Sequence, residues 1–324
     1  MTASLSRRTL MTAAALSALT VTAPVMAQTA FPSQPIKVIV PYPAGGATDA
    51  LARMMAQKLG EAWNTSVLVE NKPGGGSNIG SEFVARAKPD GYTLLLGTIA
   101  NTTNMALYKN LGYDTERDFV HITQFMTAPS VLTLHPSVPA KNLREFITVA
   151  KQNPGKFAFS SSGNGGSPHL AGELLKMRAN IDLIHVPYKG AAPAIADLLG
   201  GQVQMSFQTA LSAIPHLKSG KLNVIAVASK KRMGTMPNVP TMEEQGLKDL
   251  ELQSYTVYAV PTGTPVTVQR KLNAAIVKAA NTPDVMDKVK TAGGLYFDMG
   301  LEETQTWQKR VQSRWNNIVK ETGI

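Results

Sequence analysis

The chain has no cysteine among its 324 residues, which excludes disulfide bonds, thiol catalysis and thiolate metal ligands. It also lacks the G-x-S-x-G turn of many hydrolases and the G-x-G-x-x-G turn of dinucleotide-binding proteins. We therefore expect no enzymatic activity, no cofactor and no metal site. The histidines show no H-x-x-x-H spacing; they are His121, His135, His169, His185 and His216.

The first residues of the chain carry the pattern of an export signal, and no comparable pattern follows it. Two arginines precede the uncharged stretch Thr9–Ala23 and the small-residue pattern Val25–Ala27, which is typical of a cleaved export signal at residues 1–27. The segment Ser6–Leu10 fits a twin-arginine signal as well as a Sec signal, so both routes stay open. The stretch is shorter than the ~20 residues of a spanning helix. We expect a soluble, exported protein whose mature chain begins at Gln28.

Charge is not concentrated in one region. Lys and Arg total 32 against 22 Asp and Glu, a net charge of +10, and the only basic cluster is Lys230–Arg232. No basic stripe is interleaved with aromatic residues, so we expect no nucleic-acid partner. A basic surface mildly favours an anionic ligand, because it steers anions toward the protein.

Strand patterns alternate with turns rich in Gly, Ser or Asn and with amphipathic helices, as in α/β proteins with parallel sheets. The helix expected from Asp49 to Leu59 carries its apolar residues on one face, and a long helix is expected from about Leu301 to Thr322. The expected strands are Ile36–Val40, Val67–Glu70, Tyr92–Leu96, Lys156–Phe159, Ile181–Val186, Val203–Phe207 and Leu222–Ala228.

Two extended segments, Ser130–Pro139 and Ser254–Pro261, are expected to cross between two lobes. A chain with two crossings leaves one lobe, builds the other and returns, as in receptors that close about a hinge. The predicted lobe one comprises residues 28–130 and 257–324, and lobe two comprises residues 131–256.

Two similar units carry the main functional signal. In Ile36–Leu59 and again in Lys156–Met177, a strand ends in a Gly-rich loop with hydroxyl side chains, and a helix follows at once. The helix start offers unpaired amides and the positive end of a dipole, which together favour an anion. Loops at the carboxyl ends of parallel strands are where α/β sheets bind ligands. Two such loops facing one cleft are expected to hold one small molecule.

Each loop taken alone also fits ordinary architecture, because Gly-rich turns and Ser or Thr caps are common. Asp49 has the structural alternative of capping the first helix, and His169 that of orienting its own loop. Tyr42, Tyr255 and Tyr258 either line the cleft or pack in the hinge. Further candidates at strand ends are Asn78, which follows Gly74–Ser77, and Thr98 with Asn101.

Several motifs resemble the Bug family, the periplasmic receptors of tripartite tricarboxylate transporters, in order over nearly the whole mature chain. They are Pro41–Asp49, Glu70–Gly74 with Asn78–Gly80, Pro89–Leu95, His169–Glu173, His185–Gly190, Asp197–Val203 and Gly263–Pro265.

The resemblance implies an α/β, two-lobed periplasmic-binding-protein fold, with mainly parallel sheets flanked by helices and two crossing segments as hinge. It implies capture of a small carboxylate by backbone amides, hydroxyls and water, with contacts around Ala44–Asp49 and Ser161–His169. The chain has Tyr255 where the family often has Trp and Gln208 where it often has Asp. The candidate ligand-binding residues are Tyr42, Ala44, Gly45, Gly46, Thr48, Asp49, Asn78, Thr98, Ser161, Ser162, Asn164, Ser167, His169, Gln208 and Tyr255.

The expected function is that of a monomeric solute receptor that delivers its ligand to membrane transporter subunits. A ligand-sensing receptor that docks on a sensor protein is the alternative. A serine hydrolase built on Ser162, His169 and a distant Asp is disfavoured by the missing nucleophile turn. Dicarboxylates, tricarboxylates, amino acids and aromatic acids all remain compatible with the cleft.

Overall fold

The computed structural model describes residues 31–248, 250–291, 293–296 and 298–322, so the predicted export signal lies outside the described residues. The first part of the chain contains β1 (Ile36–Val40), α1 (Ala47–Trp63), β2 (Val67–Asn71), the short 3₁₀ helix η1 (Gly75–Ser77), α2 (Asn78–Ala85), β3 (Thr93–Thr98), α3 (Ile99–Leu107) and β4 (Phe119–Leu134).

The middle of the chain contains α4 (Leu143–Gln152), β5 (Ala158–Ser161), α5 (Ser167–Ala179), β6 (Ile184–Pro187), α6 (Ala191–Leu199), β7 (Met205–Thr209), α7 (Ala210–Lys218) and β8 (Asn223–Val227). The chain then continues through β9 (Gln253–Pro261), α8 (Val266–Ala280), α9 (Pro283–Thr291), β10 (Leu295–Tyr296) and α10 (Leu301–Thr322).

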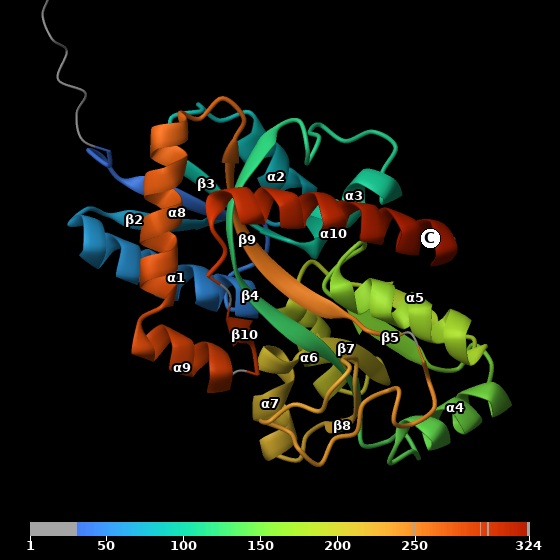
Figure 1. Cartoon of the computed structure of the whole chain (residues 1–324). Helices are drawn as coiled ribbons and strands as arrows, with labels where there is room; N and C mark the ends of the chain where they lie inside the picture. The colour runs from blue at the N-terminus through green and yellow to red at the C-terminus, as the bar shows by residue number, and fades with distance from the viewer. Residues whose placement is uncertain (1–30, 249, 292, 297, 323–324) are drawn as a thin grey trace, which may run out of the picture. The chain divides into compact units, whose positions relative to one another are not determined.

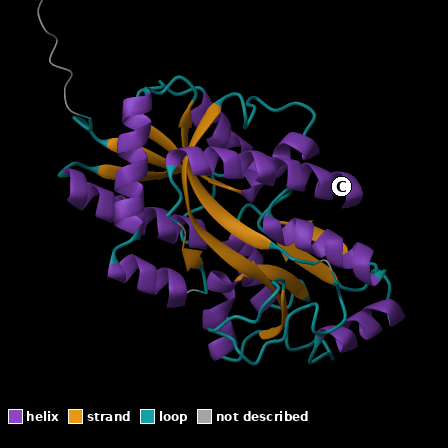
Figure 2. Cartoon of the chain, in the orientation of Figure 1, coloured by secondary structure: helices purple, strands orange, loops and turns teal. Residues whose placement is uncertain are grey.

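The strands form one mixed sheet in the order β2-β1-β3-β9-β4-β7-β5-β6, with β8 and β10 paired to β4 outside this path. Pairing is parallel in the first half of the sheet (β1, β2, β3) and in the second half (β5, β6, β7). Helices flank the strands (Figure 2). Because parallel strands need crossover connections, each half places the starts of its helices at the carboxyl edge of its strands.

The antiparallel strands β4 and β9 join the two halves and run side by side from one to the other (Figure 1). β4 pairs with β9 from Phe119 to Pro129 and with β7 from Ser130 onward. This change of partner lies next to the boundary predicted between residues 130 and 131. The lobe boundaries themselves stay predictions.

All seven predicted strands are present, with ends shifted by up to three residues. The crossing predicted at Ser254–Pro261 coincides with β9, whereas the one predicted at Ser130–Pro139 is the end of a much longer strand, β4. β8 pairs antiparallel with β4 rather than extending the parallel set. The single-sequence pattern missed the start of β4 because polar residues such as Thr123 and Gln124 interrupt the apolar run there, although they are buried.

Each half has its own buried apolar cluster. Leu51, Met55 and Leu59 of α1 pack in the first cluster with Leu94 and Tyr258, which confirms the predicted apolar face of this helix. Phe146, Phe159 and Phe207 form the second cluster with α4 and α5. The C-terminal helix α10 contacts α3, β4 and α5 and adds Trp315 to the second cluster, so it bridges both halves.

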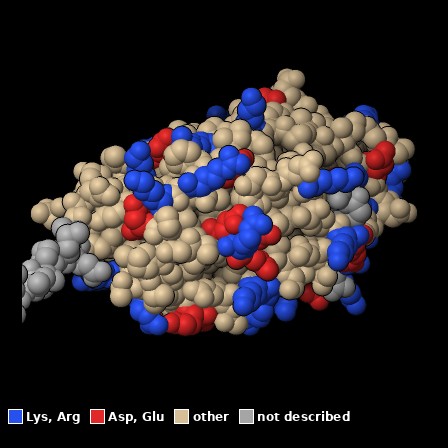
Figure 3. Space-filling view, turned by 90° about the horizontal axis from the view of Figure 1, so that it is seen from above, with Lys and Arg blue, Asp and Glu red and all other residues tan. Residues whose placement is uncertain are grey.

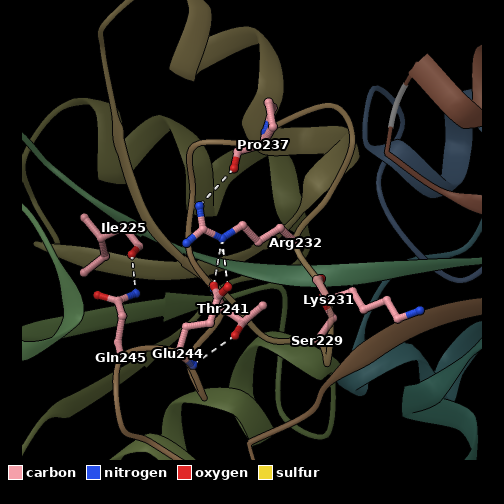
Figure 4. Close-up of polar contacts among 8 residues, drawn as sticks. All are labelled: Ile225, Ser229, Lys231, Arg232, Pro237, Thr241, Glu244 and Gln245. Carbon is pink, nitrogen blue, oxygen red and sulfur yellow. Dashed lines mark hydrogen bonds and ion pairs between the residues drawn. The ribbon is translucent and has the colours of Figure 1, made fainter.

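The basic cluster Lys230–Arg232 lies in an irregular segment between β8 and β9 (Figure 4). Nε of Arg232 donates to both carboxylate oxygens of Glu244, at 3.0 and 2.9 Å, and a second guanidinium nitrogen donates to the carbonyl of Pro237. Glu244 also accepts from the amide of Thr241 at 2.7 Å. Arg232 therefore holds the segment together, and Nζ of Lys230 lies 3.9 Å from a carboxylate oxygen of Glu251.

Candidate functional site

The two predicted strand-loop-helix units face one cavity, called the central cavity here. Its volume is about 60 Å³, and it lies where the carboxyl ends of β1, β3, β5 and β7 meet. The residues that line it come from both halves of the sheet: Tyr42, Pro43, Gly46, Ala47, Thr48, Thr98, Ile99, Ser162, Gly166, Ser167, Pro168, Ala191, Ala192, Gln208, Thr209, Ser212 and Ser254.

In the first unit, Asp49 holds the loop that precedes α1. Its Oδ2 accepts the amide hydrogen of Gly45 at 3.0 Å and a hydrogen from Nε of Arg53 at 3.0 Å. Its Oδ1 accepts from the side chain of Asn71 at 2.9 Å. Burial alone would raise the pKa of Asp49, but the hydrogen bonds from Arg53, Gly45 and Asn71 lower it below its usual value. The carboxylate therefore stays charged and fixes the loop.

In the second unit, His169 holds the loop that precedes α5. Its Nδ1 accepts the amide hydrogen of Gly165 at 3.1 Å. Its ring stacks on His185, with ring centroids 4.1 Å apart, and His185 stacks in turn on Phe159 at 4.8 Å. Burial lowers the pKa of His169, because the charged ring would lose its hydration. A neutral ring with its proton on Nε2 keeps Nδ1 available as an acceptor.

The two loops share one backbone design. Gly45 and Gly165 both have positive φ, 85° and 77°, and each is followed by a glycine that caps the helix without a side-chain hydrogen bond. In both, the third helical residue reaches back to the amide two residues before the helix starts. The helix-start amides are therefore not consumed by a capping side chain, and residues at both helix starts line the central cavity.

Three further helices begin at the same cavity. Thr98 and Ile99 start α3, Ala191 starts α6, and Thr209 precedes α7. Helices α6 and α7 likewise have no side-chain cap. The positive ends of five helix dipoles thus converge on one small volume.

No lysine, arginine, aspartate or glutamate is among the described residues that line the central cavity. Elsewhere, on the face in Figure 3, blue and red groups are interspersed among wide uncharged areas. An anion in the cavity would meet backbone dipoles, hydroxyl groups and the Gln208 amide, with no formal counter-charge beside it.

Seven of the predicted site residues line the central cavity. Tyr42 and Thr98 hold each other there through hydroxyl groups 2.7 Å apart, and Gln208 donates from Nε2 to Oγ of Ser206 at 2.6 Å. As ligand contacts, all seven remain predictions. They are Tyr42, Gly46, Thr48, Thr98, Ser162, Ser167 and Gln208.

The other predicted residues do not line the central cavity. Ala44 and Gly45 lie beside it on the exposed side of the first loop. Asn164 lines a neighbouring cavity. Asp49 and His169 hold the two loops, as described above.

Three more predicted residues already have protein partners. The Ser161 hydroxyl lies 2.7 Å from Nε2 of His185. Oδ1 of Asn78 accepts from Asn104 at 2.6 Å. The hydroxyl of Tyr255 lies 2.6 Å from that of Thr102, with Trp307 edge-on to its ring. Contact with a ligand therefore stays a prediction for these three side chains, which are bonded within the protein.

Several lining residues were not predicted, above all Ala191, Ala192, Thr209 and Ser212. A usable signal exists, because α6 and α7 also follow strands directly. Gly190 and Thr209 stand before them in the same way as Gly46 and Gly166 stand before α1 and α5. Looking for every strand-to-helix turn, rather than for the two richest in glycine, would have found them.

The geometry does not assemble the hydrolase triad considered from the sequence. Nδ1 of His169 is occupied by the Gly165 amide, and within the described residues no hydrogen bond joins His169 to Ser162. In that same part of the chain, no three His, Asp or Glu side chains gather as metal ligands would. Nor is any helix there long and apolar enough to cross a membrane.

A family model described as the tripartite tricarboxylate transporter family receptor matches residues 51–324. Among solved structures, the periplasmic binding protein BugD is 34% identical, with a TM-score of 0.87 over 91% of this chain and 99% of that one. The resemblance to the Bug family is therefore confirmed, as is the α/β periplasmic-binding-protein fold.

Two solved structures with bound ligands are similar as well. An adipate-bound protein of R. palustris is 29% identical, with a TM-score of 0.88 over 91% of this chain and 99% of its own. MatC of Rhodopseudomonas palustris, solved with bound malate, is 29% identical, with a TM-score of 0.85 over 89% of this chain and 100% of its own.

Proposed function

Because the chain belongs to the tripartite tricarboxylate transporter receptor family, we propose that it captures a small organic carboxylate in the periplasm and delivers it to a tripartite membrane transporter. The family consists of solute-binding receptors rather than enzymes. Two similar proteins hold dicarboxylates, adipate and malate. A carboxylate ligand is therefore the first class to test.

The observation that carries this proposal is the convergence of five helix starts on a cavity lined by uncharged residues. Backbone amides and helix dipoles bind an anion without a buried charged side chain. Such a side chain would be costly to desolvate while the site is empty. Hydroxyls of Thr48, Ser162 and Ser167 add directional hydrogen bonds from both halves. A cation would instead be repelled by the same dipoles.

Contacts on the flanks of the cavity support capture by closure. Gly190 of the second half lies so close to Pro43 of the first that an added Cβ would come within 2.7 Å of the proline ring. An added Cβ at Gly76 would lie 3.0 Å from the carbonyl oxygen of Asn164. We infer that the two halves part about β4 and β9 to admit the ligand, which then favours the closed state.

A thermal-shift screen of the mature protein against a carboxylate library tests the binding step. A ligand at a hundred times its Kd adds about 2.7 kcal/mol of stability and raises the Tm by several degrees. The neutral alcohol analogue and the cationic amine analogue of each acid serve as controls and should leave the Tm unchanged. If no organic acid raises the Tm, the proposal is wrong.

A pull-down tests the delivery step. The liganded receptor is offered to membranes that contain the tripartite transporter and, separately, to sensor ectodomains of the same bacterium. We expect retention on the transporter membranes that depends on the ligand. Retention by a sensor alone would replace delivery with ligand sensing.

A further inference from the structure

Asn164 is the one asparagine of the chain that is followed directly by glycine, and the pair lies in the loop between β5 and α5. In such a pair the backbone nitrogen of the glycine attacks the side-chain amide carbon of the asparagine, because glycine has no side chain to hinder the approach. The attack forms a cyclic imide and releases ammonia. Water then opens the imide to an aspartyl or isoaspartyl residue, so Asn164 is a candidate for spontaneous modification.

The Asn164 side chain is accessible for this reaction. The residue is exposed, and over the part of the chain that the structure describes its amide has no hydrogen-bond partner. It lines a cavity of about 250 Å³ beside the central one, called the side cavity here. Glycine stands on both sides of it, at Gly163 and Gly165, so no neighbouring side chain crowds the reacting atoms.

The attacking nitrogen, that of Gly165, is held by His169. Nδ1 of His169 accepts the hydrogen of this nitrogen at 3.1 Å. In the cyclic imide, the side-chain carbon of Asn164 takes the place of that hydrogen in the plane of the amide. The His169 ring therefore stands where this carbon must arrive, and it is buried and stacked on His185. The hydrogen bond that anchors the loop thus also hinders ring closure.

Contacts with the first half of the sheet restrain the same loop again. Oγ1 of Thr103, in α3, donates to the carbonyl oxygen of Gly165 at 2.6 Å. An added Cβ at Gly76 would lie 3.0 Å from the carbonyl oxygen of Asn164, so these two backbones pass close to each other. Both contacts join the two halves, and both are lost when the halves part about β4 and β9. The closed state therefore restrains the loop more than the open state does.

The product of the reaction carries a negative charge close to the central cavity. Asn164 lines the side cavity with Tyr42 and Ser162, and these two residues line the central cavity as well. A carboxylate at Asn164 would repel an acid bound there. Solvent screens this repulsion because the residue is exposed, and Lys189 in the same lining offsets part of it. Deamidation is therefore expected to weaken the binding of an acid by a modest factor.

We propose that Asn164–Gly165 is a site of spontaneous deamidation, faster in the open receptor than in the closed one and slowed in both by His169. A bond forms from the Gly165 nitrogen to the side-chain carbon of Asn164, and the bond from that carbon to its amide nitrogen breaks. The Gly165 proton leaves on the amide nitrogen as ammonia. Water adds to one imide carbonyl and leaves a new carboxylate, and no oxidant or reductant takes part. The dependence on closure rests on the proposed function.

Ageing of the native protein at mildly alkaline pH, followed by peptide mass spectrometry and an isoaspartate assay, tests the reaction. We expect the acid to appear at Asn164 before any other asparagine. Asn238 is the matched internal control, since it is exposed in a turn but is followed by the branched residue Val239. Asn164→Gln should remove the reaction at this position, because the longer side chain would have to close a larger ring.

A carboxylate ligand tests the dependence on closure. At a hundred times its Kd, the ligand leaves the empty form about a hundredfold less populated. The ligand should therefore slow modification of Asn164 by at least about tenfold and leave the rate at Asn238 unchanged. An equal rate at Asn164 with and without bound ligand would show that closure does not protect this loop.

Two variants separate protection by His169 from catalysis by it. His169→Leu removes the acceptor, and modification of Asn164 should rise about two- to tenfold, the factor that one lost hydrogen bond allows. His169→Asn keeps an acceptor, as Asp49 does in the first loop, and should stay near the wild-type rate. A lower rate in His169→Leu would mean that His169 acts as a general base, contrary to the proposal. If His169→Leu folds poorly, ageing with and without ligand still decides the proposal.

Asn164→Asp imitates the product and measures its effect on binding. Calorimetry should show carboxylate affinity about two- to fivefold lower in Asn164→Asp than in Asn164→Gln, the range for an exposed pair of charges. Equal affinity in the two variants, or an Asn164 that ages no faster than Asn238, contradicts the proposal and leaves the receptor function standing. If no carboxylate binds, the receptor function fails together with protection by the ligand, and ageing alone decides whether Asn164 is modified.

Discussion

The loops Gly45–Asp49 and Gly165–His169 reach the same backbone geometry with different chemistry. Both place a glycine with positive φ two residues before a helix, and both anchor its amide to the third helical side chain. The first anchor is a charged carboxylate with three hydrogen-bonding partners, and the second is a neutral imidazole packed against another ring. The same loop conformation can thus be held by a charged side chain, Asp49, or by a neutral one, His169.

The largest expected difference between the two loops is the loss of unfolding free energy when the first glycine of each, Gly45 or Gly165, is replaced by alanine. An added Cβ at Gly165 would come within 2.4 Å of the Asn104 side chain and 3.0 Å of that of Leu107, whereas at Gly45 it would meet nothing within 4 Å. Both substitutions force alanine into positive φ, which costs about 1 kcal/mol. We expect Gly165→Ala to lose roughly 3 kcal/mol of unfolding free energy and Gly45→Ala about 1.

Urea denaturation of both variants measures this difference. Equal losses at the two glycines would show that the second loop moves aside, so that its close contacts with α3 do not constrain it.

A smaller loss of unfolding free energy is expected when the charge of Asp49 is removed. Asp49→Asn keeps an acceptor for Gly45 but weakens the charge-assisted bonds to Arg53 and Asn71, so we expect a loss of about 2 kcal/mol in unfolding free energy. Half of the Arg53 side chain is exposed, and solvent therefore limits the effect. A loss below 0.5 kcal/mol would mean that the amide anchor alone matters.

Asp49 and His169 should also differ in how they make the unfolding free energy depend on pH. Burial lowers the pKa of His169 below the usual 6.5. Below pH 6.5 the unfolded chain therefore binds a proton that the native ring does not, and stability falls as pH drops toward the native pKa. His121 and His185, whose pKa burial lowers to about 4 and about 3, act with the same sign.

The contribution of His169 to this loss of stability is measured by comparing denaturation curves of wild type and His169→Asn from pH 8 to 5. The variant should lose about 1 kcal/mol less than wild type over this range. The lowered pKa of Asp49 puts its own loss at pH below about 4, so Asp49→Asn should follow the wild-type slope between pH 8 and 5. Identical slopes in wild type and His169→Asn would rule out this role for the ring.

The smallest effects are expected in ligand binding, where one hydroxyl comes from the second loop and one from the helix that follows it. Ser162→Ala and Ser167→Ala should each weaken carboxylate binding by about 0.5–1.5 kcal/mol, the usual net value of one hydrogen bond. Ser313→Ala on α10 is the control, since that hydroxyl bonds only to its own helix. Wild-type affinity in both site variants would remove these hydroxyls from the binding step.

Much of the fold followed from local pattern. Strands such as Ile36–Val40 are short apolar runs between turns, and the apolar residues of α1 recur at helical spacing, so each is visible within a few residues. The length of β4 was missed because its polar residues, such as Thr123 and Gln124, are buried where this strand pairs with β9. Burial of that kind depends on partners far along the chain.

The residues that line the central cavity were predictable to a similar extent. Thr48, Ser162 and Ser167 were found because they sit in Gly-rich loops before helices, and they do line the cavity. Asp49, Ser161 and His169 stand in the same loops, yet they turn inward to bond Gly45, His185 and Gly165. Nothing in the spacing of residues distinguishes a side chain that turns toward the cavity from one that supports the loop from behind.

The sequence by itself indicated the two helix-start units, because positive φ before a helix favours glycine and a dipole requires only the helix that follows. Only the tertiary structure decided that these two helix starts share one volume with the starts of α3, α6 and α7. The physical reason is that local conformation depends on neighbouring residues, whereas convergence depends on how β4 and β9 join two halves that are distant in the chain.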